Sequence, residues 1–183
     1  MSKSDIKKLA RKFRKAVLGT GERLGMDSAL IKKENLREII LFLRDDEKMQ
    51  YNFLRDITCV DYLHRQPRFE VVYVLYSIAN KQQAVIKVPL DEDDTELASI
   101  HDLYGAANWG EREVWDMYGI KFKGHPDLRR ILMYEEFEGF PLRKDYAKQD
   151  SQPRTELLKP ERDAVEEFKT FHLDKDTTGS RVG

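Results

Sequence analysis

The chain contains a single cysteine, Cys59, among its 183 residues. One thiol cannot form a disulfide within the chain, and iron–sulfur clusters need several thiolates from the protein that binds them. The sequence therefore excludes an internal disulfide framework and a cluster held by this chain alone. Cys59 lies in a stretch predicted to be a strand, where we expect it to act as a small apolar side chain.

Long hydrophobic runs are also missing. No stretch approaches the roughly 18 consecutive apolar residues of a membrane-spanning helix. The N-terminus lacks the apolar core that follows the charges of a signal peptide. Its basic, acid-poor character resembles a mitochondrial presequence, but lysine outnumbers arginine there and serine is scarce. We therefore expect a cytoplasmic protein without a membrane segment of its own.

An excess of charge of either sign is absent, because the formal net charge is −1. Such a balance gives no global attraction to nucleic acid or to acidic membranes. Charged residues make up 36% of the chain and hydrophobic residues 40%, which is typical of a protein with a modest core and a large polar surface. Locally, residues 3–15 are strongly basic and residues 91–96 are acidic; we expect the acidic run to be a solvated loop.

No complete nucleotide-binding or catalytic motif is present. The glycines of residues 19–25 resemble a dinucleotide loop, but the last comes one position late and the segment follows a predicted helix, so we interpret it as a helix stop. Residues 105–110 have the spacing of a phosphate loop, but Glu111 stands where a phosphate-binding lysine is needed. None of the histidines has the four-residue spacing that places two imidazoles on one helix face for zinc: His64, His101, His125 and His172.

Hydrophobic periodicity predicts the regular elements. Helical spacing is found from Ser4 to the glycines at 19–21, and again over residues 35–44. The first helix has a basic outer face; it could lie on an anionic membrane, although packing against a core is the commoner outcome. A third helical stretch, residues 97–118, is interrupted near Gly105 and restarts at Ala106.

Strand patterns lie between the helices. Residues 69–78 are rich in β-branched and aromatic side chains and form a predicted hairpin with residues 84–88. Residues 51–62 predict another strand, and residues 24–31 a short one. Helices and strands in mixed order predict an α+β domain over residues 1–119, with a small mixed sheet layered with helices on one side.

After Gly119 no periodic pattern remains. A structureless segment of this length is improbable inside a compact domain. Disorder is one interpretation, but the apolar side chains are too many for a simple solvated tail. We therefore expect residues 120–183 to form an extended partner-binding arm, carried by Phe122, Ile131, Leu132, Met133, Tyr134, Phe137, Phe140, Leu142 and Tyr146.

One charged cluster, within residues 111–119, remains as a candidate for chemistry. On a helix, Arg112 and Asp116 stand four positions apart and can pair, while Glu113 and Asp116 share a face. Two carboxylates with His125 nearby could serve in acid–base chemistry or bind a hard metal, as in a free-standing hydrolase. The alternative, which we favour, is that these carboxylates pair with arginines: Arg129, Arg130 and Arg143.

The same region carries a family resemblance. Residues 111–132 read Glu-Arg-Glu-Val-Trp-Asp-Met-Tyr-Gly-Ile-Lys-Phe-Lys-Gly-His-Pro-Asp-Leu-Arg-Arg-Ile-Leu, and residues 138–146 read Glu-Gly-Phe-Pro-Leu-Arg-Lys-Asp-Tyr. This run resembles the signature of the 30-kDa subunit family of respiratory complex I. The resemblance is close over residues 105–146 and weaker over 36–90. It departs at Phe140, where relatives often have histidine, and at Ala147, where proline is common. Its defining positions are Glu111, Arg112, Glu113, Asp116, His125, Arg129 and Ile131.

The resemblance implies a non-catalytic subunit in the hydrophilic arm of a proton-translocating NADH:quinone oxidoreductase. The chain would bind the 49-kDa subunit, which helps form the quinone site, and support electron transfer from NADH to quinone. FMN and iron–sulfur clusters would belong to partner subunits, with no cofactor bound by this chain. The expected place is peripheral, on the cytoplasmic side of the bacterial inner membrane, with membrane association only through the complex.

The residues expected to bind the partner are Glu111, Arg112, Glu113, Asp116, His125, Arg129, Arg130, Arg143, Lys144 and Asp145. An alternative is the same docking role in a different complex, because membrane-bound energy-converting hydrogenases and related dehydrogenases use a homologous subunit. The sequence leaves both possibilities open.

Overall fold

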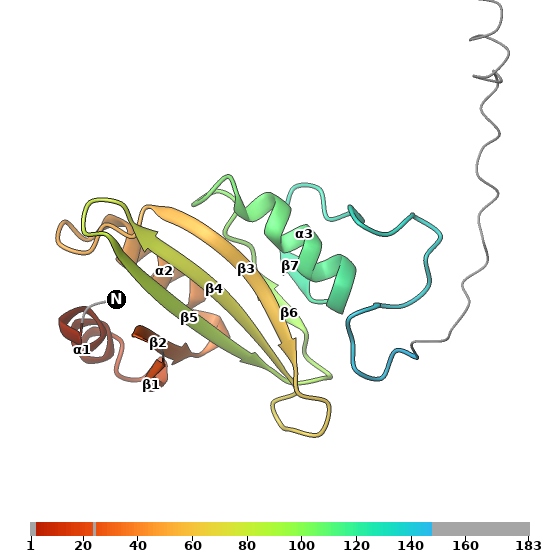
Figure 1. Cartoon of the computed structure of the whole chain (residues 1–183), viewed down its shortest axis with the longest axis horizontal. Helices are drawn as coiled ribbons and strands as arrows, with labels where there is room; N and C mark the ends of the chain where they lie inside the picture. Colours follow the sequence, from red (N-terminus) through yellow and green to blue (C-terminus); the bar gives the residue numbers. More distant parts are fainter. Residues whose placement is uncertain (1–2, 24, 148–183) are drawn as a thin grey trace, which may run out of the picture. The chain divides into compact units, whose positions relative to one another are not determined.

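A five-stranded mixed sheet is the centre of the fold, and a two-stranded sheet lies beside it (Figure 1). The computed structural model describes residues 3–23 and 25–147. In chain order the elements are α1 (Lys3–Lys12), β1 (Val17–Arg23), β2 (Met26–Ile31), a 3-10 turn (Lys33–Asn35), α2 (Leu36–Asp45), β3 (Phe53–Asp61), β4 (Phe69–Ser77), β5 (Gln82–Leu90), β6 (Glu96–Ala98), α3 (Ala107–Tyr118) and β7 (Lys121–Lys123). The predicted α+β class is confirmed.

The strands of the large sheet lie in the order β1-β2-β5-β4-β3. β4 pairs antiparallel with both β3 and β5, which confirms the predicted hairpin, and β5 runs parallel to β2. Along β4, buried residues alternate with partly exposed ones at all nine positions. This alternation follows from the two-residue period of a strand, which places Val71, Tyr73 and Leu75 on one face.

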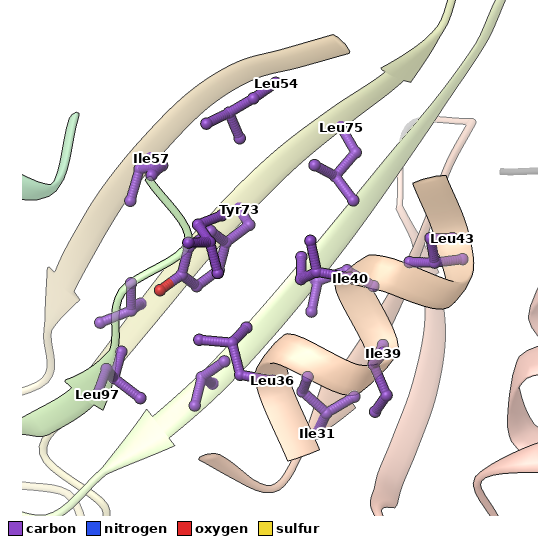
Figure 2. Packing of buried hydrophobic residues seen from close by; sticks show 14 of the residues in the cluster. Ile31, Leu36, Ile39, Ile40, Leu43, Leu54, Ile57, Tyr73, Leu75 and Leu97 are labelled. Carbon is purple, nitrogen blue, oxygen red and sulfur yellow. The ribbon is translucent and has the colours of Figure 1, made fainter. Parts of the chain in front are cut away.

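Helix α2 covers that face of the sheet (Figure 2). Its apolar side chains recur at positions i, i+3, i+4 and i+7, so they form one stripe, and all four are fully buried: Leu36, Ile39, Ile40 and Leu43. Burying each such side chain contributes roughly 1.5–3 kcal/mol. On the opposite face of the sheet, Val72, Val74 and Tyr76 remain partly exposed.

The N-terminal helix is shorter than predicted. It ends at Lys12, and the glycines at 19–21, interpreted as a helix stop, lie inside strand β1. β1 pairs with β2 through a tight hairpin in which Arg23 faces Met26 and Gly25 has a φ of 74°. Glycine adopts this left-handed conformation without strain. Leu9 and Phe13 are buried in the core, so the apolar face of α1 already has a partner within the chain.

The helix predicted over residues 97–118 is wrong in its first half. Glu96–Ala98 is strand β6, and α3 begins only at Ala107. β6 pairs in parallel with β7, so that Leu97 faces Phe122. Both side chains are buried, and this long-range pairing outweighs the local helical spacing.

Contacts cross the predicted domain boundary after Gly119. Strand β7 was not predicted; Ile120 and Phe122 belong to the hydrophobic core, and the described residues up to 147 group with the rest of the domain in one compact unit. α3 ends at Gly119, whose φ is 76° and whose N–H donates to the carbonyl of Trp115. The ring of Phe140 lies against Gly119, where an added Cβ would come within 2.5–2.8 Å of it. The segment 120–147 therefore continues the fold, while the part of the predicted arm from 148 to 183 lies outside the described residues.

Candidate functional site

The signature residues of α3 have different surroundings. Glu111, Arg112 and Asp116 are buried, whereas Glu113 is exposed. The prediction that Glu113 and Asp116 share a face of the helix is therefore wrong in its consequence, because only Glu113 reaches the surface.

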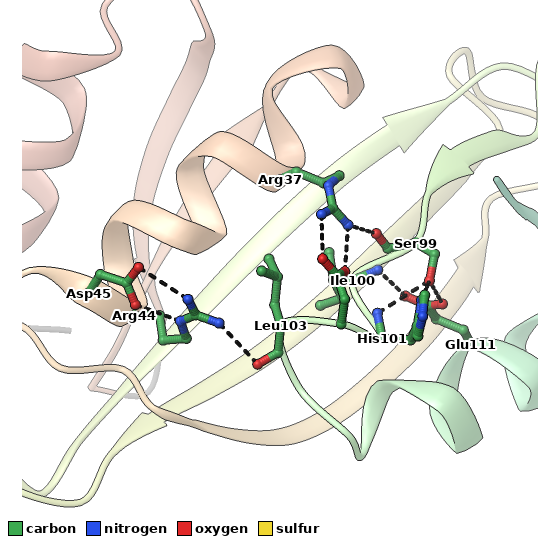
Figure 3. A network of polar contacts seen from close by, with 9 residues as sticks. Arg37, Arg44, Asp45, Ser99, Ile100, His101, Leu103 and Glu111 are labelled. Atoms are coloured by element: carbon green, nitrogen blue, oxygen red, sulfur yellow. Dashed lines mark hydrogen bonds and ion pairs between the residues drawn. The ribbon is translucent and has the colours of Figure 1, made fainter. Parts of the chain in front are cut away.

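The carboxylate of Glu111 connects α3 to the chain that follows β6 (Figure 3). One oxygen accepts from the hydroxyl of Ser99 at 2.5 Å and the other from the N–H of Ile100 at 2.7 Å. The Ser99 hydroxyl also lies 3.0 Å from Nδ1 of His101. Burial raises the pKa of Glu111 to about 7, because its hydrogen bonds only partly compensate for the lost water. Glu111 thus holds the turn that replaces the predicted helix.

Two arginines of α2 hold the same turn from the other side (Figure 3). Arg37 binds both oxygens of Asp102 at 2.7 Å and donates to the carbonyl of Ser99. This hydrogen-bonded pairing lowers the pKa of Asp102 to about 2. Arg44 donates to the carbonyl of Leu103 at 3.3 Å. The residues 99–103 are therefore tied to both α2 and α3.

Asp116 organises the segment after β7. One of its oxygens accepts from three consecutive N–H groups, those of residues 131–133, at 3.1, 2.8 and 3.0 Å. The other oxygen binds Arg130 at 2.6 Å. Burial would raise the pKa of Asp116, but the three N–H groups and Arg130 outweigh it and hold the pKa below its usual range. One buried carboxylate therefore satisfies three backbone donors of an irregular loop.

Arg112 and Arg130 bind carbonyl groups of the same loop. Arg112 donates to the carbonyls of Arg129 and Arg130 at 3.1 and 3.2 Å, instead of pairing with Asp116 as the helical spacing allowed. Arg130 donates to the carbonyls of Phe137 and Gly139 at 2.7 and 3.1 Å. We call Arg112, Asp116 and Arg130 the α3 clamp.

His125 fixes the start of the loop against α3. Its Nε2 lies 3.1 Å from the carbonyl of Asn108, and the N–H of Asp127 lies 3.1 Å from its Nδ1. A carbonyl only accepts and an N–H only donates, so Nε2 carries the proton and the ring is neutral. Burial lowers the pKa of His125, which favours the same state.

The far end of the segment is tied to the sheet. Arg68 forms two bonds to Asp61, at 3.0 and 2.9 Å, and one to Asp145 at 2.7 Å. The N–H of Lys144 donates to Asp61 at 2.9 Å. Arg143 donates to the carbonyl of Tyr118 at 2.7 Å. These contacts return the chain to the ends of β3 and β4.

Most of the predicted partner-binding residues therefore also have contacts within this chain. Glu113 is exposed, and Arg129 lies at the surface in a pair with Asp127 at 2.9 Å. Their partner-binding role stays a prediction. The sequence analysis missed Ser99, Asp61 and Arg68 as site residues. Asp61 and Arg68 flank the loop between β3 and β4, and only this position could have suggested that they pair.

The hydrolase alternative lacks a common site. Asp116 and His125 are engaged in separate bonds, and Glu113 points to the surface. Among residues 3–23 and 25–147, no three His, Cys, Asp or Glu side chains are arranged to hold a metal ion. Burial raises the pKa of the Cys59 thiol to about 12, so it is protonated at neutral pH and a poor metal ligand.

The clamped segment presents apolar side chains to solvent. Leu132 is 56% exposed, and Tyr134 and Leu142 are also exposed. We call these three residues the loop surface. Trp109, on α3, is 63% exposed. These exposed apolar side chains are available to contact another protein.

Comparison with known proteins identifies a family. Residues 29–152 match the family described as "Respiratory-chain NADH dehydrogenase, 30 Kd subunit". The chain is 49% identical over 141 residues to the subunit designated C of the NADH-quinone oxidoreductase of Citrifermentans bemidjiense, covering 77% of this chain and 86% of that protein. It is 48% identical over 130 residues to the equally named protein of a Roseiflexus species, covering 71% and 75%.

Solved structures agree on the fold. A trypsin-resistant fragment of Nqo5 has a TM-score of 0.60 at 33% identity, covering 68% of this chain and 98% of the fragment. A chain of an archaeal membrane-bound sulfane sulfur reductase has a TM-score of 0.66 at 23% identity, covering 80% and 85%, and shows similarity of fold alone. In the described part of this chain, no helix is long and apolar enough to cross a membrane.

Proposed function

Because the chain belongs to the respiratory-chain NADH dehydrogenase 30 Kd subunit family, we propose that it acts as a docking subunit of a respiratory NADH–quinone oxidoreductase. It contributes a binding surface to the complex and no catalytic residue of its own. The complex as a whole transfers electrons from NADH to quinone and translocates protons.

The α3 clamp is the observation that supports this role best. The buried Arg112 and Asp116 and the half-buried Arg130 fix the backbone of residues 129–139 with their hydrogen bonds, while the loop surface remains exposed. A preformed backbone loses less conformational entropy on binding than a flexible one. The signature of the family thus builds a rigid surface of apolar side chains.

The chemistry of the side chains supports a chain without its own redox group. Its one thiol is buried and protonated at neutral pH. The buried carboxylates of the signature are also engaged, Glu111 with Ser99 and Ile100, and Asp116 with Arg130 and three N–H groups. In this proposal FMN and the iron–sulfur clusters are held by partner subunits.

The partner that we propose is the 49-kDa subunit, in a complex on the cytoplasmic side of the bacterial inner membrane. The chain reaches the membrane only through that complex. The alternative is an equivalent place in an energy-converting hydrogenase or related membrane complex. We favour the NADH-linked complex because the relatives at 44–49% identity are named as parts of an NADH-quinone oxidoreductase.

Purification through a tag on the full chain tests the proposal. We expect the 49-kDa subunit and NADH-oxidising, flavin-containing subunits to co-purify, with NADH–quinone activity. Replacing Leu132 and Leu142 by Asp places charges on the loop surface, and should lower the co-purifying subunits by about tenfold or more. Both residues are exposed, so the melting temperature of the isolated chain should change little.

Ile78→Asp is the matched control, because Ile78 is 60% exposed in the turn between β4 and β5. This variant should assemble like the unchanged chain. Co-purification of hydrogenase subunits would support the alternative complex. A tagged chain that brings down no NADH-oxidising partner would contradict the docking role.

A further inference from the structure

A groove runs between the edge strand β3 and helix α3. Its strand side is residues 54–57, and its helix side consists of positions i, i+3, i+4 and i+7 of one stripe: Ala106, Trp109, Gly110 and Glu113. Gly110 allows the close approach of the two elements, because a Cβ there would lie 3.1 Å from Cβ of Ile57. Ile131 closes the groove. We call these residues the β3–α3 groove.

Glu113 is a charged residue of the groove that forms no ion pair within the described part of the chain. Among the signature carboxylates, Glu111 binds Ser99 and Asp116 binds Arg130. No basic side chain in the described ranges lies within ion-pair distance of Glu113. Its carboxylate stands at the surface of α3 with its hydrogen-bonding capacity available to another molecule.

Trp109, one turn before Glu113 on the same helix, offers an aromatic face. Trp109 is 63% exposed, which is unusual for the largest apolar side chain on a helix. Arg112 lies 5.3 Å from the centre of its ring, while its guanidinium donates to backbone carbonyls. The rest of the indole remains open, so a second cation can approach it.

The cation of the strand side, Arg55, lines the groove but is engaged with another residue. Arg55 binds Gln83 of β5 at 2.7 Å, and β4 lies between these two strands. The Arg55 guanidinium therefore reaches across β4 to Gln83 and is not paired with Glu113. Asp56 lies at the rim of the groove and adds a second negative charge.

We propose that the β3–α3 groove receives an arginine side chain from a partner protein. The guanidinium would lie over the open part of Trp109 and donate to the carboxylate of Glu113. Arginine fits better than lysine, because its planar group stacks on aromatic rings and offers five donors. This inference rests on the proposed docking function, and it names the partner chemistry at a set of residues other than the loop surface.

An arginine analogue tests the site on the full chain. The chain has two tryptophans, Trp109 and Trp115, so labelling the indole nitrogens gives two resonances, which a Trp109→Phe variant assigns. N-acetyl-arginine amide should shift the Trp109 resonance and leave that of Trp115 in place. N-acetyl-citrulline amide has nearly the same shape without the charge, and should produce a much smaller shift.

Glu113→Gln removes the charge from an exposed position without altering the core. Because a hydrogen bond between charged groups contributes about 1.5–3 kcal/mol, the dissociation constant of the arginine analogue should rise about tenfold or more. Glu38→Gln is the control, since Glu38 is an exposed glutamate of α2. Equal shifts with the citrulline compound, no shift of Trp109, or unchanged binding to Glu113→Gln would overturn the proposal.

Assembly of the whole complex can be measured to test this proposal separately from the docking function. In the tagged full chain, Glu113→Arg should lower co-purification of the other subunits by about tenfold, since it sets two cations against each other. If that variant assembles normally while charges on the loop surface abolish assembly, the arginine site is wrong and the docking function stands.

Discussion

Strands β3–β5 and the segment 120–147 belong to the same compact unit, yet they are stabilised differently. The strands bond to one another along their backbones and bury an apolar face under α2. The segment has one three-residue strand, and many of its other backbone groups bond to charged side chains. Removing one apolar side chain weakens a sheet locally, whereas removing one clamp residue leaves several half-buried backbone groups without their partner at once.

Asp116→Ala should have the largest effect. Removing one partner of a buried ion pair costs about 3–5 kcal/mol, and three N–H groups lose their acceptor as well. Urea unfolding should show this loss, and hydrogen exchange should show faster opening at residues 131–133 than in β4. Asp127→Ala is the control, because the Asp127 carboxylate is exposed. If β4 and the loop opened equally, the two regions would be one cooperative unit.

The sheet could be predicted because its signal is local. Residues 69–78 and 84–88 alternate in a way that each strand displays by itself, and α2 shows its buried stripe in ten residues. Strands β6 and β7 have three residues each and exist because they pair across more than twenty intervening residues. No periodicity in a three-residue stretch can reveal such a pairing.

The sequence predicted which residues belong to the candidate site but not which hydrogen bonds they form. The signature pattern singled out Glu111, Asp116 and Arg130 as site residues. Asp116 does pair with an arginine, as predicted. The bonds to N–H and carbonyl groups remained hidden, because every residue carries those groups and the sequence does not distinguish them. The apolar residues of 120–147 appeared to need another protein for burial, although Phe122 is buried in this chain.

The pH dependence of stability should be the next largest effect. The pKa of Glu111 is raised from 4.5 to about 7 in the folded chain. A raised pKa means that the folded state binds the proton more tightly, so this contribution is complete below about pH 4.5 and is lost as the pH rises through 7. The loss is on the order of 3 kcal/mol.

Glu111→Gln isolates this contribution. An amide can accept from Ile100 and donate to Ser99, but it does not titrate. The difference in unfolding free energy between variant and unchanged chain should therefore shift in favour of the variant from pH 5 to pH 8. Comparing the two chains cancels the opposite contribution of His125, whose lowered pKa favours folding as the pH rises. A constant difference would refute a buried, titrating Glu111.

Gly119→Ala tests the junction between the two regions. A side chain at a φ of 76° is strained, and its Cβ would collide with the ring of Phe140. We expect a loss of about 1–3 kcal/mol. Adding Phe140→Leu to this variant should recover part of it if the contact matters, and none of it if backbone strain alone is responsible. Thermal unfolding of both variants measures the difference.

Arg129→Ala should have the smallest effect on the isolated chain. Its ion pair with Asp127 is exposed on both sides, and such pairs contribute about 0–1 kcal/mol. Its carbonyl bond to Arg112 belongs to the backbone and survives the substitution. An unchanged melting temperature with reduced assembly would assign Arg129 to the partner, whereas a large loss of stability would place it among the structural residues.

The three N–H groups that converge on Asp116 have a consequence for the order of events in folding. Their acceptor sits on α3, as does Arg112, so residues 129–133 have nothing to close upon until that helix has formed and docked. We therefore expect the exposed Leu132 to reach its final position after α3 has docked. On the proposed docking function, a chain that is damaged or only partly folded would not display this surface, and partners would bind only fully folded copies.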